Sequence, residues 1–60
     1  MIYRLVYFAG KEALGSKPFT GDEAGAIAQA KKELDTQKSH GVTKAVVRDR
    51  NLKVVTELSA

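Results

Sequence analysis

The chain has no cysteine and no tryptophan, and it has one proline and one histidine among its 60 residues. The absence of cysteine excludes disulfides and thiolate metal sites, two of the usual aids to stability in very small domains. A folded chain of this length buries only about 60% of the surface that its unfolded form exposes. We therefore expect residues 1–60 to form one small domain, with self-association as its remaining source of added stability.

Long apolar runs are also missing. The apolar start from Ile2 to Ala9 is interrupted by Arg4, and it lacks the basic segment and small-residue cleavage site that mark a signal peptide. It is too short to span a bilayer. These features and the lack of cysteine predict a protein without a membrane partner that works in a reducing, cytoplasmic compartment.

Charge of one sign is not in large excess. Ten Lys and Arg residues stand against seven Asp and Glu residues, which gives a net charge of +3. Dedicated nucleic-acid-binding domains usually carry a stronger basic excess or a basic cluster. Net charge alone therefore leaves nucleic-acid binding open.

The first third of the chain predicts a hairpin. Tyr3 to Phe8 is rich in aromatic and β-branched residues, which favour a strand, and a turn is expected at residues 10–12. Ala13 to Phe19 then forms a second, poorer strand. Pro18 lacks a backbone donor, so this second strand is expected at a sheet edge.

A helix is expected in the middle of the chain. Thr20 and Glu23 match a capping box, in which the Thr20 hydroxyl accepts a hydrogen bond from the Glu23 amide. Gly41 supplies a left-handed residue that ends a helix. The helix is thus predicted from Gly21 to Ser39 or His40. Its buried stripe is predicted to consist of Ala24, Ile27, Ala30 and Leu34.

The last third predicts a second hairpin, from Thr43 to Asp49 and from Leu52 to Leu58. A two-residue loop at positions 50 and 51 suits it, because asparagine at position 51 tolerates positive φ. In that register Val46 faces Val55 and Lys44 faces Glu57, and the opposed charges favour this pairing.

Strand, strand, helix, strand and strand form a ββαββ order. This order predicts an α+β domain, an antiparallel sheet of three to four strands with one helix packed on one face. The layout, carried by the stretches Phe19 to Leu34 and Val46 to Val55, resembles small bacterial domains of uncharacterised function that have a hairpin, a central helix and a second hairpin. The resemblance covers the whole chain and implies a fold without an activity.

The two faces of the predicted sheet have different side chains. The face beneath the helix is expected to hold Tyr3, Leu5, Tyr7, Ala45, Val47, Leu52, Val54 and Leu58. Alternation along the strands places another apolar set, mixed with cations, on the opposite face, and only one helix is available to cover the sheet. An apolar patch with a charged rim commonly marks a contact surface. The predicted interaction face consists of Arg4, Val6, Phe8, Lys44, Val46, Arg48, Lys53 and Val55.

Residue sets with catalytic or metal-binding chemistry are not evident. His40 falls near the helix end, where a structural cap or a solvated side chain explains it, and a lone histidine is no zinc signature. Gly15-Ser16-Lys17 lacks the upstream glycine and the strand-to-helix context of a phosphate-binding loop. Asp22 and Glu23 are explained by helix capping. We expect no enzyme activity, no cofactor and no metal.

Two functions remain open for the predicted interaction face. The first is a non-enzymatic interaction or regulatory domain that forms a homodimer, or binds another protein, through this face. The alternative is a nucleic-acid-binding domain that places the same cations against phosphates or bases. Most of the four aromatic residues are expected in the core, with Phe8 as the exception on the basic face. Size alone also allows an accessory partner in a toxin–antitoxin or phage system.

Overall fold

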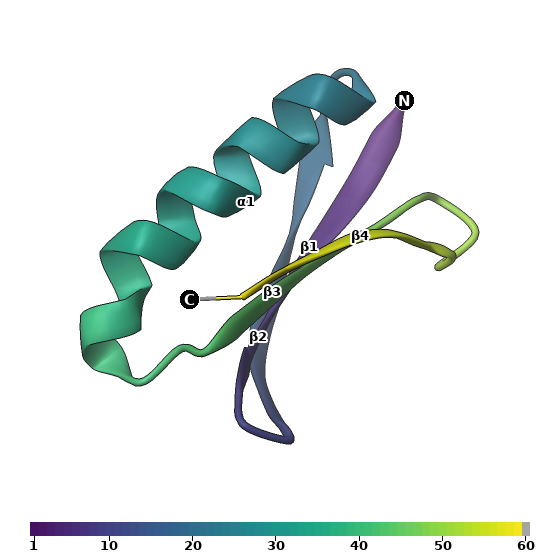
Figure 1. The fold of residues 1–60 in the computed structure, drawn as a ribbon. Helices are drawn as coiled ribbons and strands as arrows, with labels where there is room; N and C mark the ends of the chain where they lie inside the picture. Colours follow the sequence, from purple (N-terminus) through teal and green to yellow (C-terminus); the bar gives the residue numbers. More distant parts are fainter. Residues whose placement is uncertain (60) are drawn as a thin grey trace.

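The computed structural model describes residues 1–59 and has two layers, a four-stranded antiparallel sheet and one α-helix lying across it (Figure 1). The elements follow the chain as β1 (Ile2–Ala9), β2 (Glu12–Thr20), α1 (Glu23–Gln37), the 3-10 turn η1 (Lys38–His40), β3 (Lys44–Arg48) and β4 (Val54–Ser59). The predicted α+β class and ββαββ order are confirmed.

The strands lie in the order β2-β1-β3-β4, so β1 and β3 occupy the centre of the sheet. β1 turns into β2 through Gly10 and Lys11, and Gly10 has the positive φ of 64° that tight hairpin turns favour at their first residue. Pro18 lies on β2, an edge strand, as its missing backbone donor predicts.

The helix begins at a different cap from the predicted one. The Asp22 carboxylate accepts a hydrogen bond from the Gly25 amide at 2.7 Å, whereas Thr20 is the last residue of β2 and pairs with Ile2. Because the backbone of Thr20 is paired in the sheet, Thr20 lies before the helix and Asp22 is the residue that caps it. A Cβ atom on Gly25 would lie 2.8 Å from the Asp22 Oδ1 and 3.1 Å from the Phe19 ring, so any other residue there would force the capping carboxylate and the ring to shift.

The end of the helix agrees with the sequence. α1 ends at Gln37, the turn η1 follows, and Gly41 adopts the left-handed conformation with φ 96°. This conformation lets the chain leave the helix and return toward the sheet. Neither helical element in residues 1–59 has the length and apolar character needed to cross a membrane.

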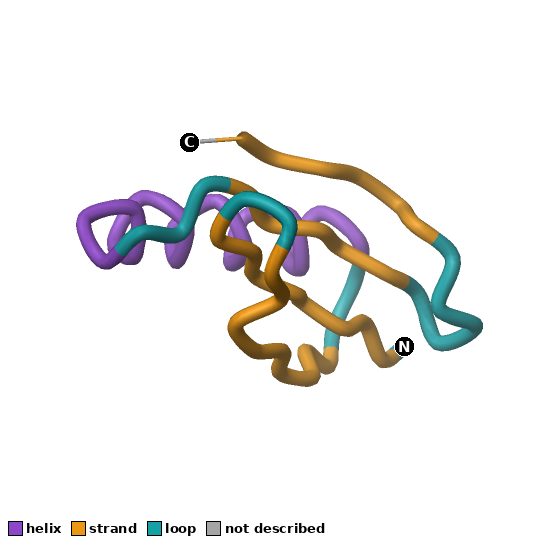
Figure 2. The backbone as a smooth tube through the Cα atoms, turned by 90° about the horizontal axis from the view of Figure 1, so that it is seen from below, coloured by secondary structure: helices purple, strands orange, loops and turns teal. Residues whose placement is uncertain are grey.

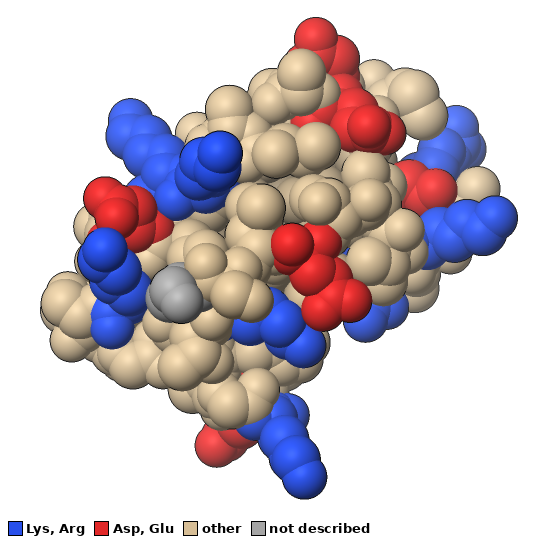
Figure 3. All heavy atoms as spheres, in the orientation of Figure 1, with Lys and Arg blue, Asp and Glu red and all other residues tan. Residues whose placement is uncertain are grey.

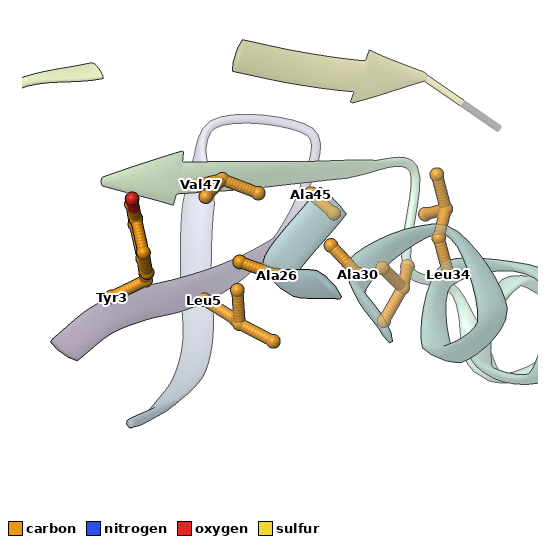
Figure 4. Packing of buried hydrophobic residues seen from close by; sticks show 8 residues of the cluster. Tyr3, Leu5, Ala26, Ala30, Leu34, Ala45 and Val47 are labelled. Atoms are coloured by element: carbon orange, nitrogen blue, oxygen red, sulfur yellow. The ribbon is translucent and has the colours of Figure 1, made fainter. Parts of the chain in front are cut away.

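The core lies between α1 and the two central strands (Figure 4). Leu5 and Val47 are fully buried from the sheet side, and the small side chains of Ala26 and Ala30 let the helix approach them closely. One predicted stripe position is wrong, because Ala24 is exposed and Ala26 lies in the core instead. The cluster consists of Tyr3, Leu5, Ala26, Ala30, Leu34, Val42, Ala45 and Val47.

The β3–β4 loop is longer than predicted. The Leu52 amide donates to the Asp49 carbonyl, and the Asp49 amide donates to the Lys53 carbonyl, both at 2.9 Å. Positive φ falls on Leu52, at 65°, and not on Asn51. The Asp49 carboxylate stabilises this loop by accepting from the amides of Asn51 and Lys53. Leu52, predicted beneath the helix, is 58% exposed in the loop.

The register of β3 and β4 also differs from the prediction, by two residues. Val46 lies opposite Glu57, and the pairing is irregular between Val47 and Arg48, where Val54 lies opposite Arg48 and Val55 is the extra residue of a bulge. A bulge changes which side of the sheet the following residues face. Val55, predicted on the interaction face, therefore packs against the core. Val54, predicted beneath the helix, faces the other side and is 49% exposed.

Candidate functional site

The face of the sheet opposite α1 is the candidate site, and we call it the open face. No helix or loop covers it in residues 1–59, and Figures 1 and 2 show α1 on one side of the sheet only. Strand alternation and register define its members. The open face consists of Ile2, Arg4, Val6, Phe8, Lys44, Val46, Arg48, Val54 and Glu57, with Ser16, Pro18 and Thr20 from the edge strand β2.

Apolar side chains form the middle and one end of the open face. Val46 is only 3% exposed although no helix covers it, because it lies on a central strand between Val6 and Glu57. Val6 and Phe8 are half-buried. The apolar surface that remains accessible is therefore largest at Ile2 and Val54, which are 57% and 49% exposed.

Two arginines lie directly opposite each other on this face. Arg4 pairs with Arg48 across β1 and β3, and neither guanidinium has a carboxylate within 4.0 Å among the described residues. Arg4 donates to the Ser16 hydroxyl at 3.2 Å, and Arg48 donates to the Leu52 carbonyl at 3.4 Å. The Arg48 Nε is buried without a hydrogen-bond partner. The pair therefore carries positive charge that no carboxylate among the described residues balances. Like charges directly opposite each other on two strands destabilise a sheet.

The charge at the other end of the open face is balanced. The Lys44 ammonium lies 4.9 Å from the centre of the Phe8 ring and 3.6 Å from the Glu57 carboxylate. The side chains of Lys44 and Glu57 are both exposed enough that water screens their ion pair. This end combines one cation, one anion and a cation–π contact.

Six of the eight predicted site residues lie on the open face as expected, namely Arg4, Val6, Phe8, Lys44, Val46 and Arg48. Val55 does not, because the bulge turns it toward the core, and Lys53 lies in the β3–β4 loop. Sequence reasoning missed Val54. No local signal identifies it, because neighbouring valines at 54 and 55 look the same until the bulge is known.

A hollow of about 490 Å³ adjoins the arginine pair at the end of the sheet. β1 extends past β3 here, and the N-terminus and the β3–β4 loop lie at this same end in Figures 1 and 2. Its lining consists of Met1, Ile2, Tyr3, Arg4, Asp49, Arg50 and Leu52. In Figure 3, Lys and Arg atoms stand at the right-hand end, where Figure 1 draws this loop.

A second, smaller groove of about 300 Å³ lies on the helix side, between β2 and α1. Lys17 forms an ion pair with Glu33, and Gln29 donates to the same carboxylate at 2.7 Å. Burial by itself raises the pKa of Glu33, but the bonds from Lys17 and Gln29 outweigh it and hold that pKa below its ordinary value. The groove therefore contains an ionised carboxylate whose charge Lys17 balances.

Tyr7 lies in the same groove, and its hydroxyl is buried without a well-formed hydrogen bond. Burial raises the pKa of Tyr7, and the charge of Glu33 raises it further, so the phenol stays protonated. His40 also lines this groove, at the end of η1. Among residues 1–59, no three His, Cys, Asp or Glu side chains are close enough to hold a metal ion.

Comparison with protein-family models, with curated proteins and with solved structures gives no match.

Proposed function

We propose that this chain is a non-enzymatic interaction domain that binds a protein through its open face. The observation that carries the proposal is the combination of accessible apolar side chains, above all Ile2 and Val54, with two arginines that lack carboxylate partners. An apolar surface beside unmatched charge is typical of a contact surface. A domain of this size also gains stability when a partner covers such a surface.

The area needed is within reach of this molecule. A standard interface buries about 800 Å² on each partner, which is about a fifth of the 4014 Å² accessible surface of the described residues. One side of a two-layer domain can provide that fraction.

A second copy of the chain is the partner that the sequence predicts, and the charges of the open face weigh against it. Each copy would bring three cations, Arg4, Lys44 and Arg48, and a single anion, Glu57. A symmetric contact repeats the same surface on both sides, so the cations would accumulate. Homodimerisation stays a prediction, and a partner with acidic groups suits the open face better.

Nucleic-acid binding is the second candidate function. It is supported by the location of all three arginines, Arg4, Arg48 and Arg50, at one end of the molecule. Two features count against it: the Phe8 ring is already in contact with the Lys44 ammonium, and Val46 occupies the centre of the face. Phosphate contact would then rely on the arginine end alone.

Light scattering on Val54→Lys and Leu14→Lys tests self-association. Leu14 and Val54 are similarly exposed, at 52% and 49%, but Leu14 lines the helix-side groove and not the open face. If the protein dimerises through the open face, the wild type and Leu14→Lys give twice the chain mass at micromolar concentration, and Val54→Lys gives a monomer. Val46→Lys is unsuitable, because its burial within one chain would destabilise the fold itself.

A monomeric wild type would exclude the homodimer. If such a monomer bound DNA or RNA with an affinity that fell steeply with salt and with Arg48→Ala, the protein-interaction proposal would be overturned in favour of nucleic acid.

A further inference from the structure

Exposed apolar side chains are not spread evenly over this molecule. Five large apolar residues are about half exposed or more. Four of them lie at the end of the sheet that holds the arginines. Leu14 is the exception, in the helix-side groove. The four are Met1, Ile2, Leu52 and Val54.

The hollow at this end brings the two kinds of group together. Ile2 and Leu52, both more than half exposed, line it together with Arg4 and Arg50. In the unbound protein the Arg4 guanidinium donates to the Ser16 hydroxyl on β2. Arg48, next to Arg4 in the sheet, adds the buried Nε that lacks an acceptor. Arginine is among the residues enriched in interface hot spots, and hot spots lie in pockets from which a partner excludes water.

The acidic group at the hollow offsets only part of this charge. The Asp49 carboxylate lines the hollow, but it already accepts hydrogen bonds from the amides of Asn51 at 2.8 Å and Lys53 at 3.0 Å. Two arginines and one carboxylate give the lining a net positive charge. A carboxylate ligand would be attracted, and the planar guanidinium groups suit it geometrically.

We propose that this hollow is the anchoring site of the open face and that it binds a protein segment in which a carboxylate side chain stands beside an apolar one. The inference rests on the proposed function and names the chemistry of the partner. The carboxylate pairs with Arg4 and Arg50, and the apolar side chain covers Ile2 and Leu52. A phosphate backbone would satisfy the arginines but would leave both apolar side chains in water.

The loop conformation also contributes to this arrangement. Leu52 has φ 65°, a conformation that β-branched and bulky residues rarely adopt and in which glycine is usual. Positive φ at this position, together with the Asp49 bonds, leaves the Leu52 side chain 58% exposed at the rim of the hollow. More than half of the Leu52 surface is accessible, and a bound apolar side chain would bury it.

The test is a titration of the whole ¹⁵N-labelled protein with short blocked peptides, followed by NMR. An alternating Asp-Leu peptide is the probe, an Asp-Ser peptide keeps the charge without the apolar side chain, and a Lys-Leu peptide reverses the charge. We expect the Asp-Leu peptide to shift the amides of Arg4, Arg50 and Leu52. The Asp-Ser peptide is expected to bind at least tenfold more weakly, and the Lys-Leu peptide to cause no shift.

Matched variants identify the residues responsible. Arg50→Glu and Leu52→Ser are each expected to weaken Asp-Leu binding at least fivefold, because they remove the charge or the apolar wall of the hollow. Lys32→Glu makes the same charge change on the exposed surface of α1 and is expected to have no effect. A change in folding is checked from the amide spectrum of each variant before titration.

The outcomes separate this inference from the proposed function. Shifts confined to Val6, Phe8 and Lys44 would overturn the hollow as the anchor while leaving the open face as a protein-binding surface. Equal binding of the Asp-Leu and Asp-Ser peptides would overturn the role of the apolar side chains. A DNA or RNA oligonucleotide that shifted the same amides when no peptide did would overturn both proposals.

Discussion

Leu5 and Arg4 are neighbours on β1, yet they belong to surfaces with opposite properties. On the helix side, β1 and β3 contribute fully buried Leu5 and Val47, which lie beneath the alanines of α1. On the open side, the same two strands place Arg4 opposite Arg48. One face is organised by burial of apolar area and the other keeps charges that oppose stability. Local choices that oppose stability are expected at functional sites, and this is why we propose the open face as a binding surface.

The largest expected effect tests the stabilising side of this comparison. Leu5→Ala should lower the free energy of unfolding by about 2–5 kcal/mol, or unfold the protein, because the side chain is fully buried beneath α1. Val6→Ala, the next residue on the open side, should cost about 1 kcal/mol because Val6 is only half-buried. Urea denaturation of both variants measures the difference, and equal losses would show that the two faces contribute alike.

The helix that creates the difference between the faces has a testable start. Asp22→Ala should lower stability by about 1 kcal/mol, because it removes the carboxylate that accepts from the Gly25 amide. Thr20→Ala serves as the control and should have little effect, since its hydroxyl does not cap the helix. A larger loss for Thr20→Ala, seen in the same denaturation experiment, would restore the capping box predicted from the sequence.

On the open side, removing a charge should stabilise the protein. Arg4→Gln is expected to raise the stability of the isolated chain by about 0.5 kcal/mol at low salt, because it relieves the opposition to Arg48. The gain should shrink as added salt screens the two charges. Thermal unfolding at several salt concentrations measures it, and a loss of stability at every concentration would contradict the idea that this pair opposes folding.

The smallest expected effect is a pH dependence on the helix side. The folded pKa of Glu33 is lowered from 4.5, so its contribution to stability is present above that pH and is lost as the pH falls through the folded value. Lys17→Met should cost about 0.5 kcal/mol at neutral pH, since the lysine is half exposed and screened. Lys17→Met should also reduce the loss of stability as the pH is lowered below neutral. An unchanged dependence of stability on acid pH would exclude the Lys17–Glu33 ion pair as its cause.

Local features of the sequence predicted much of the fold. Tyr3 and Leu5 alternate with Arg4 and Val6, and that alternation correctly assigned both sides of β1. Gly41 marked the helix end. Both features can be predicted from the sequence because they are local. The alternation of side chains along a strand and the left-handed glycine after a helix depend only on neighbouring residues in the chain. The open face was predictable for the same reason, since six of its residues alternate on β1 and β3.

The β3–β4 hairpin shows where such reasoning fails. The sequence favoured a register in which Lys44 and Glu57 lie directly opposite each other. In the observed register they are diagonal neighbours, and their charged groups still come within 3.6 Å. The ion pair could therefore not distinguish the two registers. In the observed register Leu58 lies opposite Ala45 and packs against the core.

By itself, the sequence determined the class of the fold, the helix end, the edge position of Pro18 and the mixed character of the open face, because each follows from local backbone preference or strand alternation. Only the tertiary structure decided that Asp22 caps the helix and that Val54 and Val55 exchange sides. It also decided that Arg50 and Leu52 meet Arg4 and Ile2 at one hollow. The residues that line this hollow lie about 50 positions apart in the chain, and the pairing of β1 with β3 is what brings them to the same end of the sheet.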